Sequence, residues 1–244
     1  MTVLDLLQID LATLFMLTKT GRIQHGNEPV PSPGPRLYLA GCELGNVVRI
    51  RDDVEEETAR AINALVADEP PLRDLDSAPR PFDDYMNILS EGAPIEQRNA
   101  GLVYMLPNRL GYKHDVALVN SETPEGARLH ARLTNQGMPQ ALVELGFVEV
   151  TNIWLPWCIA LHKGKIASIG FGARIGPTGA EAGVTTVSAL RGRGFAAAAT
   201  AGWTLLPSLQ GRALFYSTDR TNVSSQRVTD RLGLRFIGAS LRIT

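Results

Sequence analysis

The sequence predicts an α/β or α+β fold, in which helices cover a β-sheet. The chain of 244 residues is 44% hydrophobic and 20% charged, so it can bury a sizeable core without disulfides. Two apolar runs, 157–161 and 166–174, flank a glycine-containing turn and indicate a β-hairpin. Predicted helices alternate with strands after residue 181, which is the pattern of helices packed on a sheet.

The second half of the chain has the clearest elements. Thr123-Pro124 starts a helix, because threonine caps helix N-termini and proline suits the first turn. A helix of small residues over 196–206 must pack closely on a neighbouring element. Gly233 ends the helix 222–232 at a position that favours a left-handed residue. The remaining predicted elements of this half are strands 115–119, 182–190, 213–217 and 234–243.

The first hundred residues are less regular. Leucine and phenylalanine recur with helical spacing over 3–18, and the proline-rich run 29–35 interrupts any helix or central strand. Acidic residues at the start and an apolar stripe predict a helix over 53–67. Residues 68–81 are rich in proline and charge and are predicted to be a connector. Short elements complete this region, namely strands at 36–40, 46–50 and 100–106 and a helix at 82–89.

The composition argues against several classes of partner. A net charge of −1 supplies no basic field for nucleic acid or an anionic membrane. Cys42 and Cys158 lie far apart and lack the spacing of metal ligands, so we expect neither a metal site nor a disulfide framework. The N-terminus lacks a basic segment followed by an apolar run, so we expect no signal peptide and a cytoplasmic location. No apolar run reaches the ~20 residues of a transmembrane helix.

The segment Arg191-Gly192-Arg193-Gly194-Phe195 carries the first chemical signal. It joins a predicted strand to the start of a predicted helix. Glycines let several backbone N–H groups turn the same way, and a helix N-terminus adds unpaired N–H groups and a partial positive charge. This arrangement binds phosphate, and the two arginines would add charge-assisted hydrogen bonds. The same residues are also compatible with a plain tight turn.

Two other nucleotide-binding loops fit the segment less well. A dinucleotide loop needs a third glycine and an acidic residue at the end of the next strand, where this sequence has Tyr216-Ser217-Thr218. A P-loop needs Gly-Lys followed by serine or threonine, and that triplet is absent here.

A resemblance to a known family adds to this reading. Residues 191–196 resemble the (Q/R)-x-x-G-x-(G/A) pyrophosphate loop of the GNAT superfamily of N-acetyltransferases. Asn222-Val223-Ser224-Ser225, followed by Leu232-Gly233-Leu234, is similar to that family's second signature. The resemblance is strong over 155–244, weaker from about 114, and absent from the first hundred residues. Two further runs resemble a bacterial subgroup with an EAGV-type strand before the loop: Glu181-Ala182-Gly183-Val184-Thr185-Thr186 and Tyr216-Ser217-Thr218.

The resemblance implies a mixed, mostly antiparallel twisted sheet flanked by helices, with an additional N-terminal α/β region. We divide the chain into an acyl-CoA-binding domain at 114–244, which the resemblance implies, and residues 1–113, to which no motif assigns a role and which could form an acceptor-side lobe or a dimer contact. Strands 182–190 and 213–217 would splay apart, and the pantetheine arm of coenzyme A would enter that gap. The residues implied in cofactor binding are Thr185, Thr186, Val187, Arg191, Gly192, Arg193, Gly194, Phe195, Ala196, Asn222 and Ser225.

These residues would contact different parts of the cofactor. Thr186 and Val187 would pair with pantetheine, and N–H groups from Gly192 to Ala196 would hold the pyrophosphate. Asn222 would bond the pantetheine or line the thioester end. Ser225 would hydrogen-bond the sulfur or help to cap its helix. A backbone N–H near Val187 would stabilise the oxyanion.

The implied activity is transfer of an acetyl group from acetyl-CoA to an amine of a small molecule or peptide, without a metal. Glu181 begins the strand that faces the cleft and is the candidate base, acting directly or through water. Many family members carry a tyrosine acid seven residues after the signature asparagine, but Thr229 stands there and is a poor proton donor. Tyr216 is the candidate substitute, at the end of the neighbouring strand.

This departure keeps other functions open. A non-catalytic module that binds acyl-CoA would need neither an acid nor a base. A nucleotide-dependent oxidoreductase is a third possibility, and it predicts binding of NAD. The sequence does not name the acceptor amine, and it allows a homodimer.

Overall fold

The computed structural model describes residues 1–72 and 79–244, so part of the predicted connector 68–81 lies outside the described residues. The helices are α1 (Val3–Leu14), α2 (Glu56–Ala67), α3 (Phe82–Gly92), α4 (Pro124–Gln136), α5 (Gln140–Val143), α6 (Phe195–Trp203) and α7 (Val223–Leu232). A two-stranded ribbon comprises β1 (Phe15–Leu17) and β2 (Ile23–Gly26). The other strands are β3 (Leu37–Cys42), β4 (Gly45–Ile50), β5 (Arg98–Leu106), β6 (Ala117–Asn120), β7 (Trp157–His162), β8 (Lys165–Ile175), β9 (Gly179–Thr186), β10 (Ala213–Asp219) and β11 (Arg235–Ile243).

One long mixed sheet organises the molecule. Within the described residues it has nine strands in the order β4-β3-β11-β5-β10-β9-β8-β7-β6. Neighbouring strands in it are antiparallel, except β9 and β10, which are parallel. The predicted fold class, a mixed and mostly antiparallel sheet flanked by helices, is therefore confirmed.

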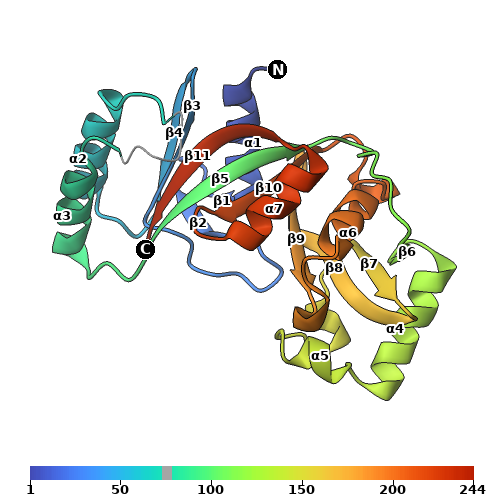
Figure 1. Ribbon diagram of the computed structural model, residues 1–244. Helices are drawn as coiled ribbons and strands as arrows, with labels where there is room; N and C mark the ends of the chain where they lie inside the picture. The colour runs from blue at the N-terminus through green and yellow to red at the C-terminus, as the bar shows by residue number, and fades with distance from the viewer. Residues whose placement is uncertain (73–78) are drawn as a thin grey trace.

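The sheet crosses the predicted boundary at residue 113. Strand β5 belongs to the first 113 residues, yet it lies between β10 and β11 and pairs with both. Figure 1 shows β5 and β11 running side by side across the middle, with α2 and α3 at one end and α4 and α5 at the other. The two predicted regions thus share one hydrogen-bonded sheet, and the boundary between them stays a prediction.

Alternation of side chains along the strands creates separate cores on the two faces of the sheet. Phe215 of β10 packs with buried leucines of α1, such as Leu7 and Leu11. The next residue, Tyr216, packs on the opposite face with Trp203 of α6. Because successive residues of a strand point to opposite faces, β10 has an α1 side and an α6–α7 side. A further core, between α2–α3 and the β3–β11 end of the sheet, includes Ile62, Leu89, Leu39 and Leu241.

Helix α6 lies unusually close to β7 and β8, as its small residues predict. A β-carbon added to Gly202 would lie 2.6 Å from the Sγ of Cys158, and one added to Gly170 would lie 3.0 Å from the carbonyl oxygen of Ala199. Larger residues at these positions would push the helix away from the sheet. The close approach positions the start of α6, where the glycine loop ends.

Three predicted elements had wrong boundaries. The helix predicted over 3–18 ends at Leu14, because Phe15 adopts an extended conformation and pairs with Gly26. The strand predicted over 182–190 ends at Thr186, because 188–190 form a 3-10 turn that redirects the chain toward the glycine loop. The helix predicted over 196–206 begins one residue earlier and ends at Trp203.

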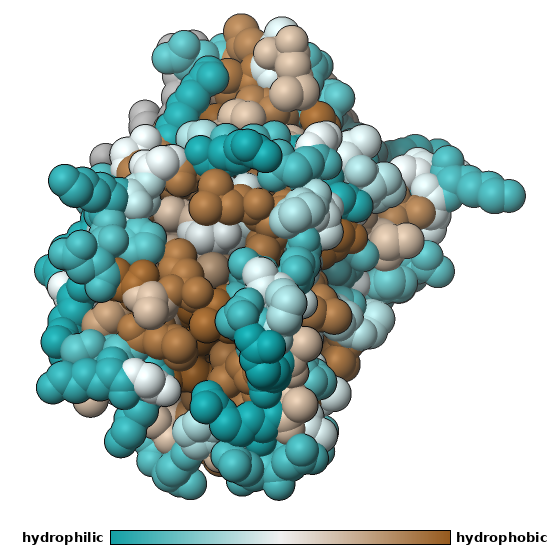
Figure 2. All heavy atoms as spheres, turned by 90° about the vertical axis from the view of Figure 1, so that its right-hand side faces the viewer, coloured by the Kyte–Doolittle hydropathy of each residue, from teal (hydrophilic) through white to brown (hydrophobic). Residues whose placement is uncertain are grey.

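The surface at the β6 end of the sheet is mixed in character. Figure 2 shows hydrophobic side chains gathered over the middle of this face, bordered by hydrophilic ones. Beneath it, α4 packs on β7 and β8 through buried residues that include Leu129, Leu133, Ile159 and Ile169. Within residues 1–72 and 79–244, no helix combines the length and apolar character needed to cross a membrane.

Candidate functional site

Strands β9 and β10 diverge in the middle of the sheet. Their parallel pairing joins Gly179–Glu181 to Ala213–Phe215 and then stops. Beyond that point β9 continues to Thr186 against β8, and β10 continues to Asp219 against β5. The family resemblance implies that strands 182–190 and 213–217 splay apart. The corresponding strands β9 and β10 do so.

Backbone groups of β9 without a partner on β10 line this gap, although the carbonyl of Thr186 accepts a hydrogen bond from Nε of Arg191 at 3.4 Å. The N–H of Val187 donates to the carbonyl of Ala167, at 2.9 Å, and therefore faces β8. Since N–H and C=O groups of successive strand residues face opposite edges, Val184 and Thr186 present theirs toward β10. The predicted pairing of Thr186 with a ligand suits this edge. The N–H of Val187 itself is already bonded to Ala167, so the oxyanion donor predicted near Val187 would have to be a neighbouring N–H that faces the gap. The backbone N–H and C=O of Thr185, two residues before Val187, also face β8 and not the gap.

The glycine loop follows the end of β9. Gly192 has φ +75° and Gly194 has φ +88°, in the left-handed region that side chains other than glycine rarely adopt. A β-carbon added to Gly192 would meet open space, so the backbone there is accessible to a ligand. The first hydrogen bond of α6 runs from the N–H of Ala198 to the carbonyl of Gly194. The N–H groups of residues 195–197 therefore have no partner within the helix, as at any helix N-terminus.

Arginines surround this loop. A hollow of about 340 Å³ lies between the loop, the start of α6 and one face of α7, and is lined by Arg191, Arg227 and Arg231. In the described part of the chain, none of the three has a carboxylate within ion-pair distance. A β-carbon added to Gly194 would lie 2.8 Å from Nη1 of Arg231, which brings α7 directly against the loop. The result is a cluster of uncompensated positive charge beside unpaired N–H groups.

The sequence-based prediction missed the arginines of α7. Ser224, Arg227 and Arg231 recur at intervals of three and four residues, so they share one face of the helix. This spacing was a usable signal, but which way the face points depends on the packing of α7 against α6.

The side chains of two predicted loop residues contact each other. Arg193 places its guanidinium over the ring of Phe195, 5.5 Å from the centroid. The Phe195 ring packs against Ala160, Ala167 and Ala199 in the core. Phe195 would therefore contact a ligand through its backbone N–H.

The start of α7 brings together the two hydroxyl groups predicted for the thioester end. Asn222 caps the helix, its Oδ1 accepting from the N–H of Ser225 at 3.1 Å. The hydroxyls of Ser225 and Tyr216 lie 2.8 Å apart. Burial raises the pKa of the Tyr216 hydroxyl above its usual range, although the bond to Ser225 opposes this shift. Tyr216 therefore keeps its proton at neutral pH. Thr229 donates to the carbonyl of Gln226 in its own helix, at 2.7 Å.

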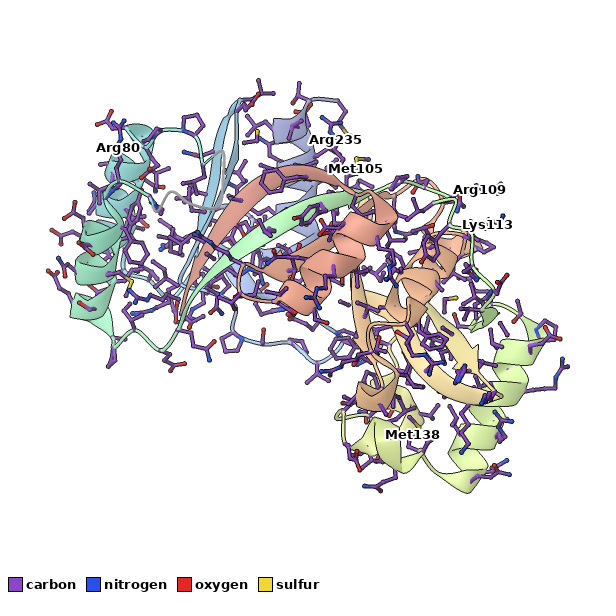
Figure 3. All side chains as sticks on the ribbon, in the orientation of Figure 1. Arg80, Met105, Arg109, Lys113, Met138 and Arg235 are labelled. Atoms are coloured by element: carbon purple, nitrogen blue, oxygen red, sulfur yellow. The ribbon has the colours of Figure 1, made fainter. Side chains whose placement is uncertain are left out.

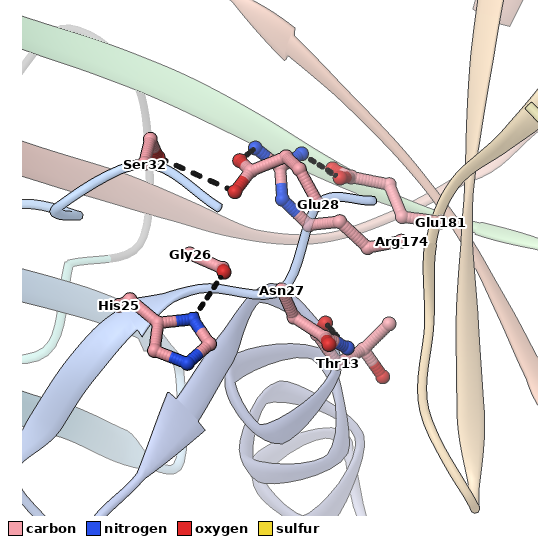
Figure 4. Close-up of polar contacts among 8 residues, drawn as sticks. All are labelled: Thr13, His25, Gly26, Asn27, Glu28, Ser32, Arg174 and Glu181. Carbon is pink, nitrogen blue, oxygen red and sulfur yellow. Dashed lines mark hydrogen bonds and ion pairs between the residues drawn. The ribbon is translucent and has the colours of Figure 1, made fainter. Parts of the chain in front are cut away.

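On the opposite face of the sheet, Glu181 belongs to an ion-paired cluster. Arg174 of β8 donates to Glu181 and also to Glu28, in the loop after β2 (Figure 4). The Glu181 side chain is only 5% exposed, so it is a buried, ion-paired carboxylate and not a solvated one. Burial lowers the pKa of the Arg174 guanidinium, but Glu181 and Glu28 outweigh burial and hold that pKa above its usual range. Both carboxylates thus face a permanent positive charge.

A second hollow, of about 230 Å³, lies beside this cluster. Its lining includes Glu181, Ser217, Asp219 and Arg242, together with the N-terminal part of β5. Phe215, opposite Glu181 in the register, belongs to the α1 core, so this hollow opens on the α1 side of the sheet. The arginine-lined hollow is on the α6–α7 side. The gap between β9 and β10 lies between them.

Sequence searches find no relative that could assign an activity. No family model matches the chain, and no curated protein does. Structural neighbours of the chain are acetyltransferases of the GNAT family.

The similarity to these structures is low throughout. A putative GNAT acetyltransferase from Novosphingobium aromaticivorans DSM 12444 is 16% identical, with a TM-score of 0.40 over 61% of this chain and 65% of that protein. A GCN5-related N-acetyltransferase-like protein from Streptococcus suis 89/1591 is 15% identical, with a TM-score of 0.41 over 87% of this chain and 85% of that one. The chain therefore spans less than two thirds of the first protein. At these identities and TM-scores, the similarity assigns no activity.

The geometry by itself limits what the site can do. Phosphates would sit on the α6–α7 side, and an extended amide-bearing arm would pair with Val184 and Thr186 in the gap. Glu181 and Asp219 line the hollow on the other side of this gap. Among the described residues, no three histidine, cysteine, aspartate or glutamate side chains gather as a metal site.

Proposed function

We propose that this protein is an acetyl-CoA-dependent N-acetyltransferase of the GNAT superfamily, of the bacterial subgroup its motifs resemble. Its acceptor would be an amine of a small molecule or peptide. The observation that carries the proposal is the continuity of the site. An arginine-lined hollow suited to phosphate, a gap lined by backbone groups of β9 that have no partner on β10, and an acidic hollow follow one another across the sheet.

The described residues fit coenzyme A by their chemistry. N–H groups at the start of α6 and the backbone of Gly192 and Gly194 suit the pyrophosphate, because oriented donors and a helix N-terminus bind phosphate oxygens. Arg227 and Arg231 would add charge-assisted hydrogen bonds to phosphate. Acetyl-CoA would supply the acetyl group as a thioester, which an amine attacks at the carbonyl carbon.

The protein's own residues would manage the protons of this reaction. Glu181 and Asp219 face the hollow in which the amine would lie, so either carboxylate can accept the proton that the amine loses. Tyr216 lies on the cofactor side and holds its proton, so it would protonate the thiolate of coenzyme A as that group leaves. Ser225 would orient the Tyr216 hydroxyl. Base and acid then act from opposite faces of the same gap.

Replacement of Gly194 by aspartate tests the cofactor site. The new carboxylate would lie against Arg231, where it would neutralise a phosphate-binding cation and occupy the loop. We expect the affinity for coenzyme A to fall about 100-fold, the equivalent of one or two lost charge-assisted hydrogen bonds. Gly211→Asp is the matched control, since Gly211 also has positive φ (+82°) but has nothing within 4 Å and precedes β10 at its far end. Equal calorimetric affinities in two folded variants would contradict the assignment.

A second candidate function, binding of acyl-CoA without transfer, is favoured by Thr229. Its hydroxyl is bonded within α7, so the family's usual acid position offers no proton donor. Thiol release from acetyl-CoA in the presence of an amine library separates the two functions. Release with any amine excludes the non-catalytic module, whereas tight binding with no release across the library would favour it. A thermal-shift screen with NAD tests the oxidoreductase function. A ligand at 100 times its dissociation constant adds about 2.7 kcal/mol to stability, so an NAD-binding protein should melt at a higher temperature with NAD.

A further inference from the structure

The acidic hollow on the α1 side carries more information about the acceptor than the presence of a base. Its volume of about 230 Å³ is below the ~300–1,000 Å³ of sites for drug-sized ligands, so it suits a small molecule. Its charges are also separated in space. Glu181 and Asp219 lie on β9 and β10, beside the gap, whereas Arg242 lies on β11. With β5 in between, β10 and β11 are about 10 Å apart.

Arg242 differs from Arg174, the other cation of this hollow. Arg174 is occupied, because its two terminal nitrogens bond Glu28 and Glu181. Arg242 lies over the ring of Tyr38, 5.6 Å from the centroid, and has no carboxylate within ion-pair distance in the described ranges 1–72 and 79–244. The carboxyl of Asp10 lies nearby, but burial raises its pKa to about 8, so it is mostly neutral at pH 7. Arg242 thus presents a half-buried, uncompensated positive charge to the hollow.

A third group in the hollow lacks a partner. The Oγ atom of Ser217 is shielded from solvent and has no hydrogen-bond partner. A buried hydroxyl without a partner is costly, and a bound polar ligand would remove that cost. Ser217 lies on β10 between the levels of Glu181 and Asp219, since Glu181 pairs with Phe215 and Asp219 is two residues further along the strand.

We propose, building on the acetyltransferase function above, that the acceptor is a small free amino acid. Its amine lies beside Glu181 and Asp219 at the gap, and its carboxylate binds Arg242. Asp219 pairs with Gly101 and Arg242 with Asn99 of β5, so Asp219 is the carboxylate nearer to Arg242, and the long arginine side chain shortens the span that a compact amino acid has to bridge. A polyamine would place a positive charge against Arg242, and an internal peptide amine would leave Arg242 unpaired.

Matched pairs of ligands test this inference by binding alone. Each L-amino acid is titrated by calorimetry or NMR against its own carboxamide, which keeps the amine and side chain but lacks the negative charge. Titrations use the full chain with and without coenzyme A, so the result does not depend on turnover. We expect at least one amino acid to bind about 10- to 100-fold more tightly than its carboxamide, as for loss of one charge-assisted bond.

Variants of two arginines on the same strand locate the effect. Arg242→Gln should remove the preference for the acid over the amide, and Arg242→Lys, which keeps the charge, should retain part of it. Arg235→Gln is the control, because Arg235 lies at the opposite end of β11 (Figure 3). The Arg235→Gln variant should keep the preference for the amino acid over its carboxamide.

Three results would overturn the inference: equal binding of acid and amide, an unchanged preference in Arg242→Gln, or no amino acid bound below roughly 10 mM. Failure of the acetyltransferase function looks different. In that case coenzyme A does not bind, or no thiol is released. The titrations still show whether the protein binds an amino acid more tightly than its carboxamide. If the protein acetylates amines equally well with and without a carboxylate, the acetyltransferase function holds, but the acceptor is not specifically an amino acid.

Discussion

Replacement of Asp10 by asparagine should make the stability of this protein less dependent on pH. Asp10 of α1 is fully buried between the helix and the sheet, and its Oδ1 has no hydrogen-bond partner. Burial, reinforced by the charge of Glu181, raises its pKa from 3.8 to about 8, although Arg242 and a 3.4 Å hydrogen bond from Tyr38 oppose this shift. The folded protein therefore carries a proton at Asp10 that the unfolded chain has released above about pH 4.

The sign and size follow from proton linkage. Between pH 5 and 7 the native state binds one more proton than the unfolded state, so the free energy of unfolding falls by about 1.4 kcal/mol per pH unit. This loss continues until the pH passes the folded pKa of about 8. Asparagine does not titrate, so the Asp10→Asn variant does not lose this stability. Relative to the wild type, its free energy of unfolding should rise by about 3 kcal/mol between pH 5 and 7.

Urea unfolding at pH 5, 6 and 7 measures this difference directly. Asp5→Asn is a matched control on the same helix, because hydrogen bonds from Thr2 lower the pKa of Asp5 and keep it ionised over this whole range. Its difference from the wild type should be constant from pH 5 to 7. The other groups that face Asp10, which are Glu181, Arg174, Arg242 and Tyr38, are shared by both proteins. A stability difference for Asp10→Asn that does not change with pH would refute the reasoning.

Two further predictions concern catalysis and packing. Tyr216→Phe should lower the turnover number about 100-fold or more, as for loss of a general acid, with little change in coenzyme A affinity. Tyr104→Phe, its partner across the β10–β5 ladder, is the control, and equal turnover in both variants would argue against Tyr216. Gly202→Ala should lower the free energy of unfolding by about 1–3 kcal/mol, because its β-carbon would overlap the Sγ of Cys158. Gly92→Ala, in a helix with nothing within 4 Å, should be neutral or stabilising in the same melts.

Local features of the sequence predicted much of the fold and one side of the site. The hairpin around Gly164, the cap at Thr123 and the stop at Gly233 are encoded within a few residues, and the structure has all three. The glycine loop was predictable for the same reason, since Gly192 and Gly194 need positive φ next to a helix start. Where these local signals weaken, as at residues 187–190, the strand prediction failed.

The hollow on the α1 side of the sheet was beyond local prediction. Arg174 bonds Glu28, which lies 146 positions away in the chain, and no spacing in the sequence announces that pair. Arg242 belongs to the last strand, yet it reaches the same hollow because β5 inserts between β10 and β11. The two arginines on α7 have a readable spacing, but only packing against α6 turns them toward the loop.

By itself the sequence determined the elements that short-range physics controls, namely glycine conformations, helix caps, and the glycine loop joined to its helix. Only the tertiary structure decided which charges meet. It buries Glu181 against Arg174, leaves Arg242 without a carboxylate partner among the described residues, and protonates Asp10 beneath them. The physical reason is that these interactions depend on burial and on strand order, which are properties of the whole sheet. The glycine loop was therefore predictable from motifs, whereas the hollow around Glu181 and Arg242 became visible only when distant strands were brought together.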